Sequence, residues 1–210
     1  MDTLSVNACK VIAVTQTAAG SARKQNPRGR GGLLRAEIVA AAFDLLDAGG
    51  TTDVVTLRAV ARAAGITAPA IYPHFASRDE LMAAMRDTVF ERVLAATAYV
   101  EGADPVDALL ASCKSYVDFG MARPASQRLM FTPIPGASGE RGEATVRSLV
   151  DALDLCVRAG RSASTDTQAD ASHLIATLHG VAMARASLPQ FPWPPLADAV
   201  HDIVVRLARL

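Results

Sequence analysis

Residues 56–80 constrain the fold of this chain more than any other part of the sequence. The stretch begins with apolar residues at helical spacing, and Gly65 follows where a left-handed residue ends a helix without steric cost. Pro69 then stands in the opening turn of a second short helix, in which Ile71 and Phe75 form a buried seam. Two short helices joined by a glycine turn are the geometry of a helix-turn-helix.

The residues that follow this turn predict how the neighbouring helices begin and end. Thr67 is expected to cap the second helix, and Pro73 should end it within about one turn because proline lacks an N–H group. Ser77 and Glu80 form a capping box, so a long helix should start at once and act as a strut to the rest of the chain. The second helix keeps an exposed face of small and hydrogen-bonding side chains, suited to a DNA major groove.

Over about 33–81 the sequence resembles the DNA-binding domain of the TetR family of transcriptional regulators, above all in the string Ile71-Tyr-Pro-His-Phe75 before the capped helix. The resemblance implies that phosphates are anchored by Thr56, Arg58, Tyr72, His74 and Arg78, and that base edges are approached by Thr67, Ala68, Pro69 and Ala70. The structural alternatives are a packing role for the Tyr72 ring and a helix-end cap for His74.

A basic cluster without any acid precedes this domain: Arg23, Lys24, Arg28, Arg30 and Arg35. Arg28 and Arg30 are candidate DNA contacts, because such a cluster can reach phosphates or a minor groove; a solvated basic tail is the alternative. We therefore expect a flexible basic arm over 1–27, a helix-turn-helix domain over 28–80 and an effector-binding and dimerisation domain over 81–210.

Half of the 210 residues are hydrophobic, few are aromatic and strand-like alternation is scarce, which indicates an all-α fold. We predict an N-terminal three-helix domain followed by a helical ligand-binding and dimerisation domain, about nine helices in all, as the resemblance also implies. After the helix-turn-helix the predicted helices cover 77–100, a stretch from Asp104-Pro105 to a break marked by Gly120 and Arg123-Pro124, a short segment through 129–131, and 143–159, 167–187 and 196–207.

The last two helices are expected to form a homodimer as a four-helix bundle, mainly because the resemblance implies it. The penultimate helix is lined with small residues and the last one has an apolar stripe. The predicted interface consists of Ala176, Gly180, Met183, Val200, Ile203, Val204 and Leu207. The alternative is that both helices pack on their own subunit.

A mostly apolar effector pocket is expected in the second domain, although each of its residues could instead be simple core. The candidates are Phe90, Leu94, Tyr116, Phe119, Met130, Phe131, His173, Thr177 and Trp193. The string Leu178-His179-Gly180 also resembles a TetR subfamily marked by Trp-His-Gly, with leucine in place of the tryptophan.

Other classes of function find little support in the sequence. It contains no nucleophile elbow, metal-ligand spacing or phosphate loop, so no enzyme and no cofactor is expected. His173 and His179 lie roughly 240° apart around a helix, which excludes a shared metal ion. No apolar run approaches the ~18 residues of a membrane span. Three unpaired cysteines without CxxC spacing favour a reducing cytoplasm.

The sequence therefore predicts a cytoplasmic, dimeric, ligand-responsive DNA-binding regulator. Its expected partners are double-stranded DNA, a second copy of itself and a small-molecule effector. A repressor of a palindromic operator is the favoured form, and an interaction or scaffold protein without regulated DNA binding is the alternative.

Overall fold

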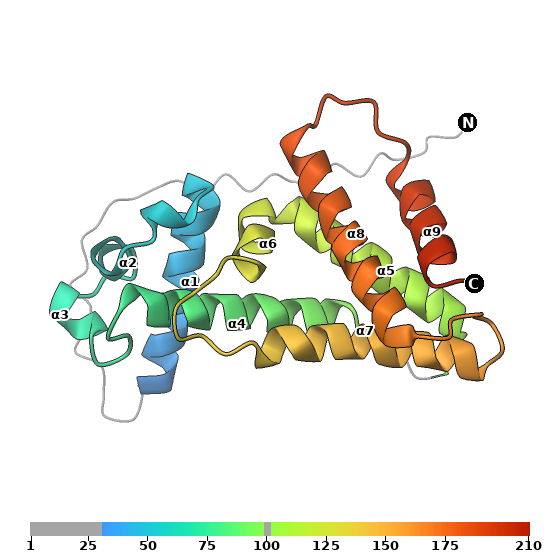
Figure 1. The fold of residues 1–210 in the computed structure, drawn as a ribbon. Helices are drawn as coiled ribbons and strands as arrows, with labels where there is room; N and C mark the ends of the chain where they lie inside the picture. The colour runs from blue at the N-terminus through green and yellow to red at the C-terminus, as the bar shows by residue number, and fades with distance from the viewer. Residues whose placement is uncertain (1–30, 99–101) are drawn as a thin grey trace, which may run out of the picture.

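The computed structural model describes residues 31–98 and 102–210, and within these ranges all regular secondary structure is helical (Figure 1), which confirms the all-α prediction. The elements are α1 (Gly31–Gly49), the 3-10 turn η1 (Thr52–Val54), α2 (Leu57–Ala63), α3 (Ala68–Ile71), α4 (Arg78–Ala96), α5 (Pro105–Ala122), α6 (Pro124–Met130), α7 (Glu140–Arg158), α8 (Thr167–Ser187) and α9 (Leu196–Leu207). The predicted arm, Arg28 and Arg30 lie outside the described residues.

The turn between α2 and α3 is built around Gly65, as the sequence predicts. Its φ of 68° lies in the left-handed region. The N–H of Gly65 donates to the Arg62 carbonyl at 3.2 Å, and the N–H of Ile66 donates to the Ala61 carbonyl at 2.9 Å. These two bonds form a Schellman motif, which satisfies carbonyls that the end of α2 would otherwise leave without donors.

The second helix of the motif, α3, is only four residues long, as Pro73 predicts. Thr67 occupies the N-cap position, but its side chain makes no capping hydrogen bond, so the predicted side-chain cap is wrong. Ile71 and Phe75 are fully buried and hold the segment on the domain core. The N–H groups of His74 and Phe75 both donate to the Ile71 carbonyl at 3.0 Å, which closes the end of the helix.

The start of α4 differs slightly from a standard capping box. Ser77 Oγ accepts a hydrogen bond from the Glu80 N–H at 3.1 Å, as expected. Glu80 Oε2, however, accepts from the N–H of Ala76 at 2.8 Å, one residue before the usual partner. From this capped end α4 runs into the second half of the molecule beside α7 (Figure 1), so the strut prediction holds, although the helix ends at Ala96.

The second domain is a bundle in which α5, α7 and α8 pack against one another and α9 packs on α5 and α8 (Figure 1). Gly120 does not break α5, which continues to Ala122. A Cβ at Gly120 would lie 2.9 Å from Gln127 Cδ and 3.0 Å from Ala182 Cβ. The glycine is therefore a close-packing position between α5, α6 and α8, and the chain breaks only before Pro124.

The other boundaries agree with the sequence to within a few residues. The predicted ranges of α8 and α9 are confirmed, and α7 begins three residues earlier than expected, at Glu140. Across the described ranges, no helix combines the length and the apolar character that crossing a membrane requires.

Candidate DNA-binding surface and effector cavity

The exposed side of α3 carries most of the residues predicted to read DNA. Thr67, Ala68 and Pro69 are exposed and Ala70 is half-buried. Tyr72, at the end of the helix, is 54 % exposed, and no partner for its hydroxyl is found among the described residues. The segment thus presents one hydroxyl, one phenol and three small apolar side chains to solvent, while its other side is locked in the core.

The flanking residues predicted to anchor phosphates differ in how far they are already engaged within the protein. Arg58 is exposed and makes no hydrogen bond or ion pair within the described part of the chain, so its guanidinium is available for a phosphate. Thr56 caps α2, because its Oγ1 accepts from the Ala59 N–H at 3.2 Å. His74 is half-buried at the end of the segment.

Arg78 has an internal role that the sequence did not reveal. Its Nε donates to the Val55 carbonyl at 2.9 Å, and its Nη2 donates to the Thr52 carbonyl at 2.7 Å. The half-buried side chain therefore ties η1 and the start of α2 to the first turn of α4. Arg35, from the predicted basic cluster, places its guanidinium carbon 4.5 Å from the centre of the Phe75 ring.

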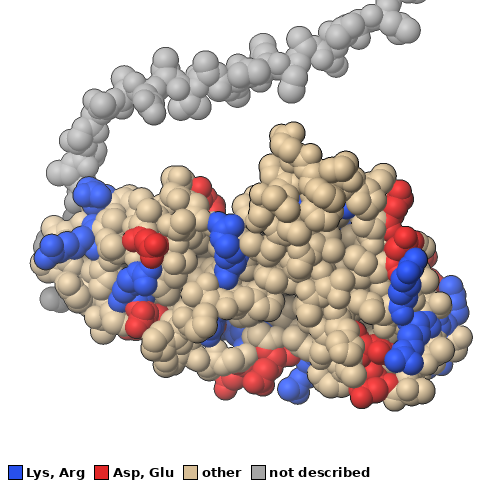
Figure 2. Space-filling model, turned by 45° about the horizontal axis from the view of Figure 1, so that its top comes forward, with Lys and Arg blue, Asp and Glu red and all other residues tan. Residues whose placement is uncertain are grey.

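Charge is interspersed rather than concentrated on the face that Figure 2 shows. Basic and acidic side chains alternate at both ends of that face, and a broad uncharged area lies between them. On this face, the end with the helix-turn-helix does not form one continuous basic patch.

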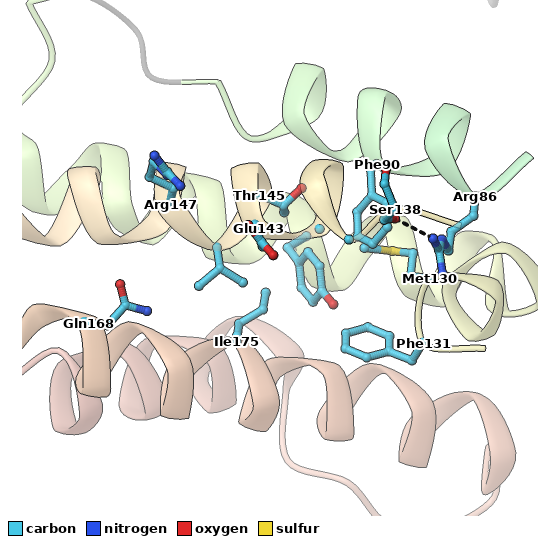
Figure 3. Close-up of a pocket in the computed structure, with 14 residues that line it drawn as sticks. Arg86, Phe90, Met130, Phe131, Ser138, Glu143, Thr145, Arg147, Gln168 and Ile175 are labelled. Atoms are coloured by element: carbon cyan, nitrogen blue, oxygen red, sulfur yellow. Dashed lines mark hydrogen bonds between the residues drawn. The ribbon is translucent and has the colours of Figure 1, made fainter. Parts of the chain in front are cut away.

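A cavity of about 610 Å³ opens between α7 and α8, next to α4 and α6 (Figure 3). Four of the predicted effector residues line it, and they supply most of its apolar wall: Phe90, Tyr116, Met130 and Phe131. The sequence did not predict its other lining residues, which are Arg86, Ser138, Gly139, Gly142, Glu143, Thr145, Val146, Arg147, Gln168 and Ile175.

The remaining predicted effector residues lie elsewhere. His173 and Thr177 are exposed on α8, because Ile175 faces the cavity and residues two positions away point in nearly the opposite direction. Trp193 Nε1 donates to the Leu188 carbonyl at 2.9 Å in the loop between α8 and α9. Leu94 lines a separate hollow beside α5 and α7, and Phe119 does not line the cavity. None of these five residues lines the cavity between α7 and α8.

One signal in the sequence could have identified Arg86. It lies four residues before Phe90 on α4, so the two side chains share a face of the helix. Ser138 and Gly142 belong to a stretch that the sequence predicts as a loop. The local sequence pattern does not show which part of the protein such a loop packs against.

A buried polar cluster lies behind the aromatic end of the cavity. His179 Nδ1 is 3.1 Å from Gln127 Nε2 and 3.4 Å from the Tyr116 hydroxyl, and its ring lies 3.9 Å from the Phe131 ring. Burial lowers the pKa of His179, which favours the neutral imidazole, and it raises the pKa of Tyr116 to about 12. Gln127 is fully buried, so this cluster joins α5, α6 and α8 in one fixed arrangement.

The predicted dimer interface is divided by the fold. Ala176 and Gly180 are exposed on α8, while Met183, Ile203 and Leu207 are half-buried. Val200 and Val204 are 1 % and 0 % exposed in the single chain. These two valines pack into their own subunit and leave almost no surface for a partner, unlike the other predicted interface residues.

No group of three or more potential metal ligands comes together within residues 31–98 and 102–210. The polar side chains that line the cavity carry guanidinium, carboxylate, amide and hydroxyl groups. Such a set can bind an organic molecule through hydrogen bonds and ion pairs.

Comparison with known proteins agrees with this organisation. Residues 38–85 match the family described as bacterial regulatory proteins of the tetR family, and residues 109–208 match the tetracyclin repressor-like C-terminal domain. No match was found among curated proteins.

Three solved structures represent the structural relatives. A protein of unknown function from Rhodococcus sp. RHA1 is 28% identical with a TM-score of 0.74, covering 88% of this chain and 98% of that one. A transcriptional regulator from Rhodococcus sp. Rha1 is 22% identical with a TM-score of 0.67, covering 83% and 96%. BioQ, solved with its natural double-stranded DNA operator, is 25% identical with a TM-score of 0.60, covering 84% and 98%.

The first family match covers the helix-turn-helix and the second covers most of the helical bundle. Together the two matches span most of the chain. The chain belongs to the TetR family of bacterial regulatory proteins.

Proposed function

We propose that this protein is a ligand-responsive transcriptional repressor that binds a palindromic operator as a homodimer and is released by a small, mostly apolar effector. The observation that carries this proposal is the cavity of about 610 Å³, one wall of which is formed by the helix that follows the helix-turn-helix. Its volume lies within the range of about 300–1,000 Å³ that small-molecule sites occupy. The protein would act in the cytoplasm as a binding protein without catalytic activity.

Two contacts give the cavity a route to the DNA-binding domain. Arg86 and Phe90 line the cavity from α4, whose first residue, Arg78, holds the carbonyls of Thr52 and Val55. The short helix α6 supplies the second route. Met130 at its end lines the cavity, and Arg128 Nη2 donates to the Gly50 carbonyl of the α1–η1 turn at 2.6 Å.

A ligand that binds one arrangement of α4 and α6 better than another would favour that arrangement, and with it one position of the helix-turn-helix relative to the bundle. The size of the shift is limited by the difference in ligand affinity between the two arrangements. In a dimer this changes the distance between two recognition helices, and with it the fit to two half-sites.

The exposed small residues of α8 support the homodimer. Nothing lies within 4 Å of a Cβ built on Gly180 in the single chain, so packing inside the subunit does not explain this glycine. Close approach of a helix from a partner subunit would explain it. The Trp-His-Gly subfamily stays a prediction that rests on Leu178-His179-Gly180, in which His179 belongs to the buried cluster beside the cavity.

The test selects binding sites from random DNA with the full chain and then screens compounds for release of the selected site. We expect a palindromic consensus and at least one compound that weakens binding tenfold or more. The scaffold alternative predicts no enriched sequence. Enrichment of one half-site without its symmetric copy would overturn the dimeric mechanism.

A further inference from the structure

The effector cavity has a cationic end formed by Arg86. Its Nη2 donates to the Ser138 carbonyl at 2.8 Å, which holds the guanidinium at one end of the groove between α7 and α8 (Figure 3). Its Nε is buried and has no hydrogen-bond partner. A buried, unpartnered donor on a charged group is rare in native proteins, and it leaves this guanidinium one hydrogen bond short.

The carboxylates around this end do not neutralise Arg86. Asp87 and Glu91, on the same helix, are both engaged by Arg141, at 3.6 Å and 2.6 Å respectively. Within the described ranges, no carboxylate lies within salt-bridge distance of Arg86. Glu143 is the one acid among the described residues that line the cavity, and it makes no ion pair within the described ranges.

The opposite end carries a second guanidinium. Arg147 and Gln168 lie there on either side of the groove (Figure 3). Arg147 is exposed, so solvent screens its charge far more than it screens the buried Nε of Arg86. With two guanidiniums and one carboxylate, the lining carries an excess of positive charge, and its desolvated part is at Arg86.

Between the two ends the wall is mostly apolar, but it includes the Glu143 carboxylate and Thr145 (Figure 3). Phe90 and Met130 lie close to Arg86, Phe131 faces the groove from below, and Ile175 continues the apolar surface along α8 (Figure 3). A ligand that fills this cavity therefore meets a mostly apolar middle section that includes the Glu143 carboxylate, and at one end the half-buried Arg86 guanidinium.

We propose that the effector is an amphipathic organic anion, whose carboxylate or similar oxyanion pairs with Arg86 while its hydrocarbon or aromatic body occupies the apolar middle. This inference rests on the proposed effector function of the same cavity. A guanidinium binds an oxyanion through charge-assisted hydrogen bonds, and within the described ranges no carboxylate pairs with Arg86 to compete for it. A cationic ligand would add a second positive charge beside Arg86.

The test uses two fluorescent probes with the same ring system, anilinonaphthalene sulfonate, which is an anion, and phenylnaphthylamine, which is neutral. Their affinities are measured for the full-length protein and for Arg86→Met, Arg86→Lys and Arg147→Met. Ile175→Trp, which fills the cavity, identifies the part of each signal that comes from this site. Circular dichroism checks that each variant is folded.

We expect Arg86→Met to weaken the sulfonate about tenfold or more, the effect of losing a charge-assisted hydrogen bond, and to change the neutral probe by less than about twofold. Arg86→Lys keeps the charge and should retain most of the sulfonate affinity even if the methionine variant is poorly folded. Arg147→Met should change both probes little.

Several results would overturn the inference. If both probes bind the cavity and Arg86→Met affects them equally, or if Arg147→Met weakens the sulfonate more than Arg86→Met does, the anion is misassigned while the effector function stands. Sulfonate binding that Ile175→Trp leaves intact would place the anion outside this cavity. If neither probe binds the wild-type protein, both the anion inference and the effector proposal fail.

Discussion

Tyr72 follows α3, and removing its hydroxyl tests whether this tyrosine contacts DNA or serves only as a packing aromatic. Tyr72→Phe should weaken operator binding by about 0.5–1.5 kcal/mol, the contribution of one neutral hydrogen bond. Stability should not change, since this hydroxyl has no partner in the described structure and the ring is 54 % exposed. A DNA titration at constant salt measures the effect. An unchanged affinity would assign the ring to packing alone.

Arg58 and Arg78 form a matched pair of arginines with different roles. Arg78→Met should destabilise the DNA-binding domain by about 1–3 kcal/mol, because it removes both hydrogen bonds to the Thr52 and Val55 carbonyls. Arg58→Met should leave the free energy of unfolding nearly unchanged, and it should reduce the slope of log affinity against log salt by about 0.9 for one lost phosphate contact.

Urea denaturation and salt-dependent DNA titrations distinguish these two roles. If Arg78→Met changes only the salt slope and leaves the urea midpoint in place, its contacts to the two carbonyls contribute little and the predicted phosphate contact prevails.

His179 predicts how stability depends on pH. Burial lowers its pKa below the ordinary 6.5, so the folded state binds fewer protons than the unfolded state in the window between the two pKa values. Its contribution to stability is complete above about pH 6.5 and is lost as the pH falls through the folded-state pKa. The free energy of unfolding should therefore decrease on acidification, and less steeply in His179→Gln. Parallel curves for the two proteins would contradict this.

At the scale of the helices, Gly120 shows how close packing overrides helix propensity. Alanine favours an isolated helix by about 1 kcal/mol over glycine. Gly120→Ala should nevertheless destabilise the protein by about 1–3 kcal/mol, because its Cβ would press on Gln127 and on the Ala182 methyl group. Gln127 is fully buried and cannot move aside without disturbing its contact to His179.

Gly32→Ala is the matched control for this prediction. Gly32 also lies in a helix, and nothing lies within 4 Å of a Cβ built there. Thermal unfolding should show a lower midpoint for Gly120→Ala only. Equal midpoints for the two variants would mean that α5, α6 and α8 can separate at little cost.

At the scale of the whole molecule, two neighbouring residues of α9 test the homodimer. Ile203 is half-buried in the single chain, whereas Val204 is fully buried. Ile203→Asp should give a folded monomer, because a buried unpaired carboxylate at the subunit interface costs several kcal/mol. Operator affinity should fall by orders of magnitude, since a monomer engages one half-site only. Val204→Asp should instead unfold the subunit itself.

Analytical ultracentrifugation with circular dichroism reports both outcomes. A dimer that persists in Ile203→Asp would move the interface away from this side of α9, and a true monomer with full operator affinity would contradict the two-half-site mechanism.

Local sequence alone determined much of this protein. The glycine turn at Gly65, the Ser77 cap, the stop at Pro73 and the bounds of α8 and α9 follow from interactions between residues a few positions apart. The helix-turn-helix and the all-helical fold could be predicted for that reason. Phe90, Tyr116 and Met130 could be proposed as cavity residues because large side chains on amphipathic helices face the interior, whereas Phe131 lies just after α6 and is 54 % exposed.

Only the tertiary structure decided which side of each helix faces which neighbour. Helical periodicity groups residues into faces, but the rotation of one helix against another depends on contacts between distant parts of the chain. This rotation turns Ile175 rather than His173 toward the cavity and buries Val200 and Val204 within their own subunit. It also brings Ser138 to Arg86 across fifty-two positions of sequence, and so creates the cationic end of the cavity.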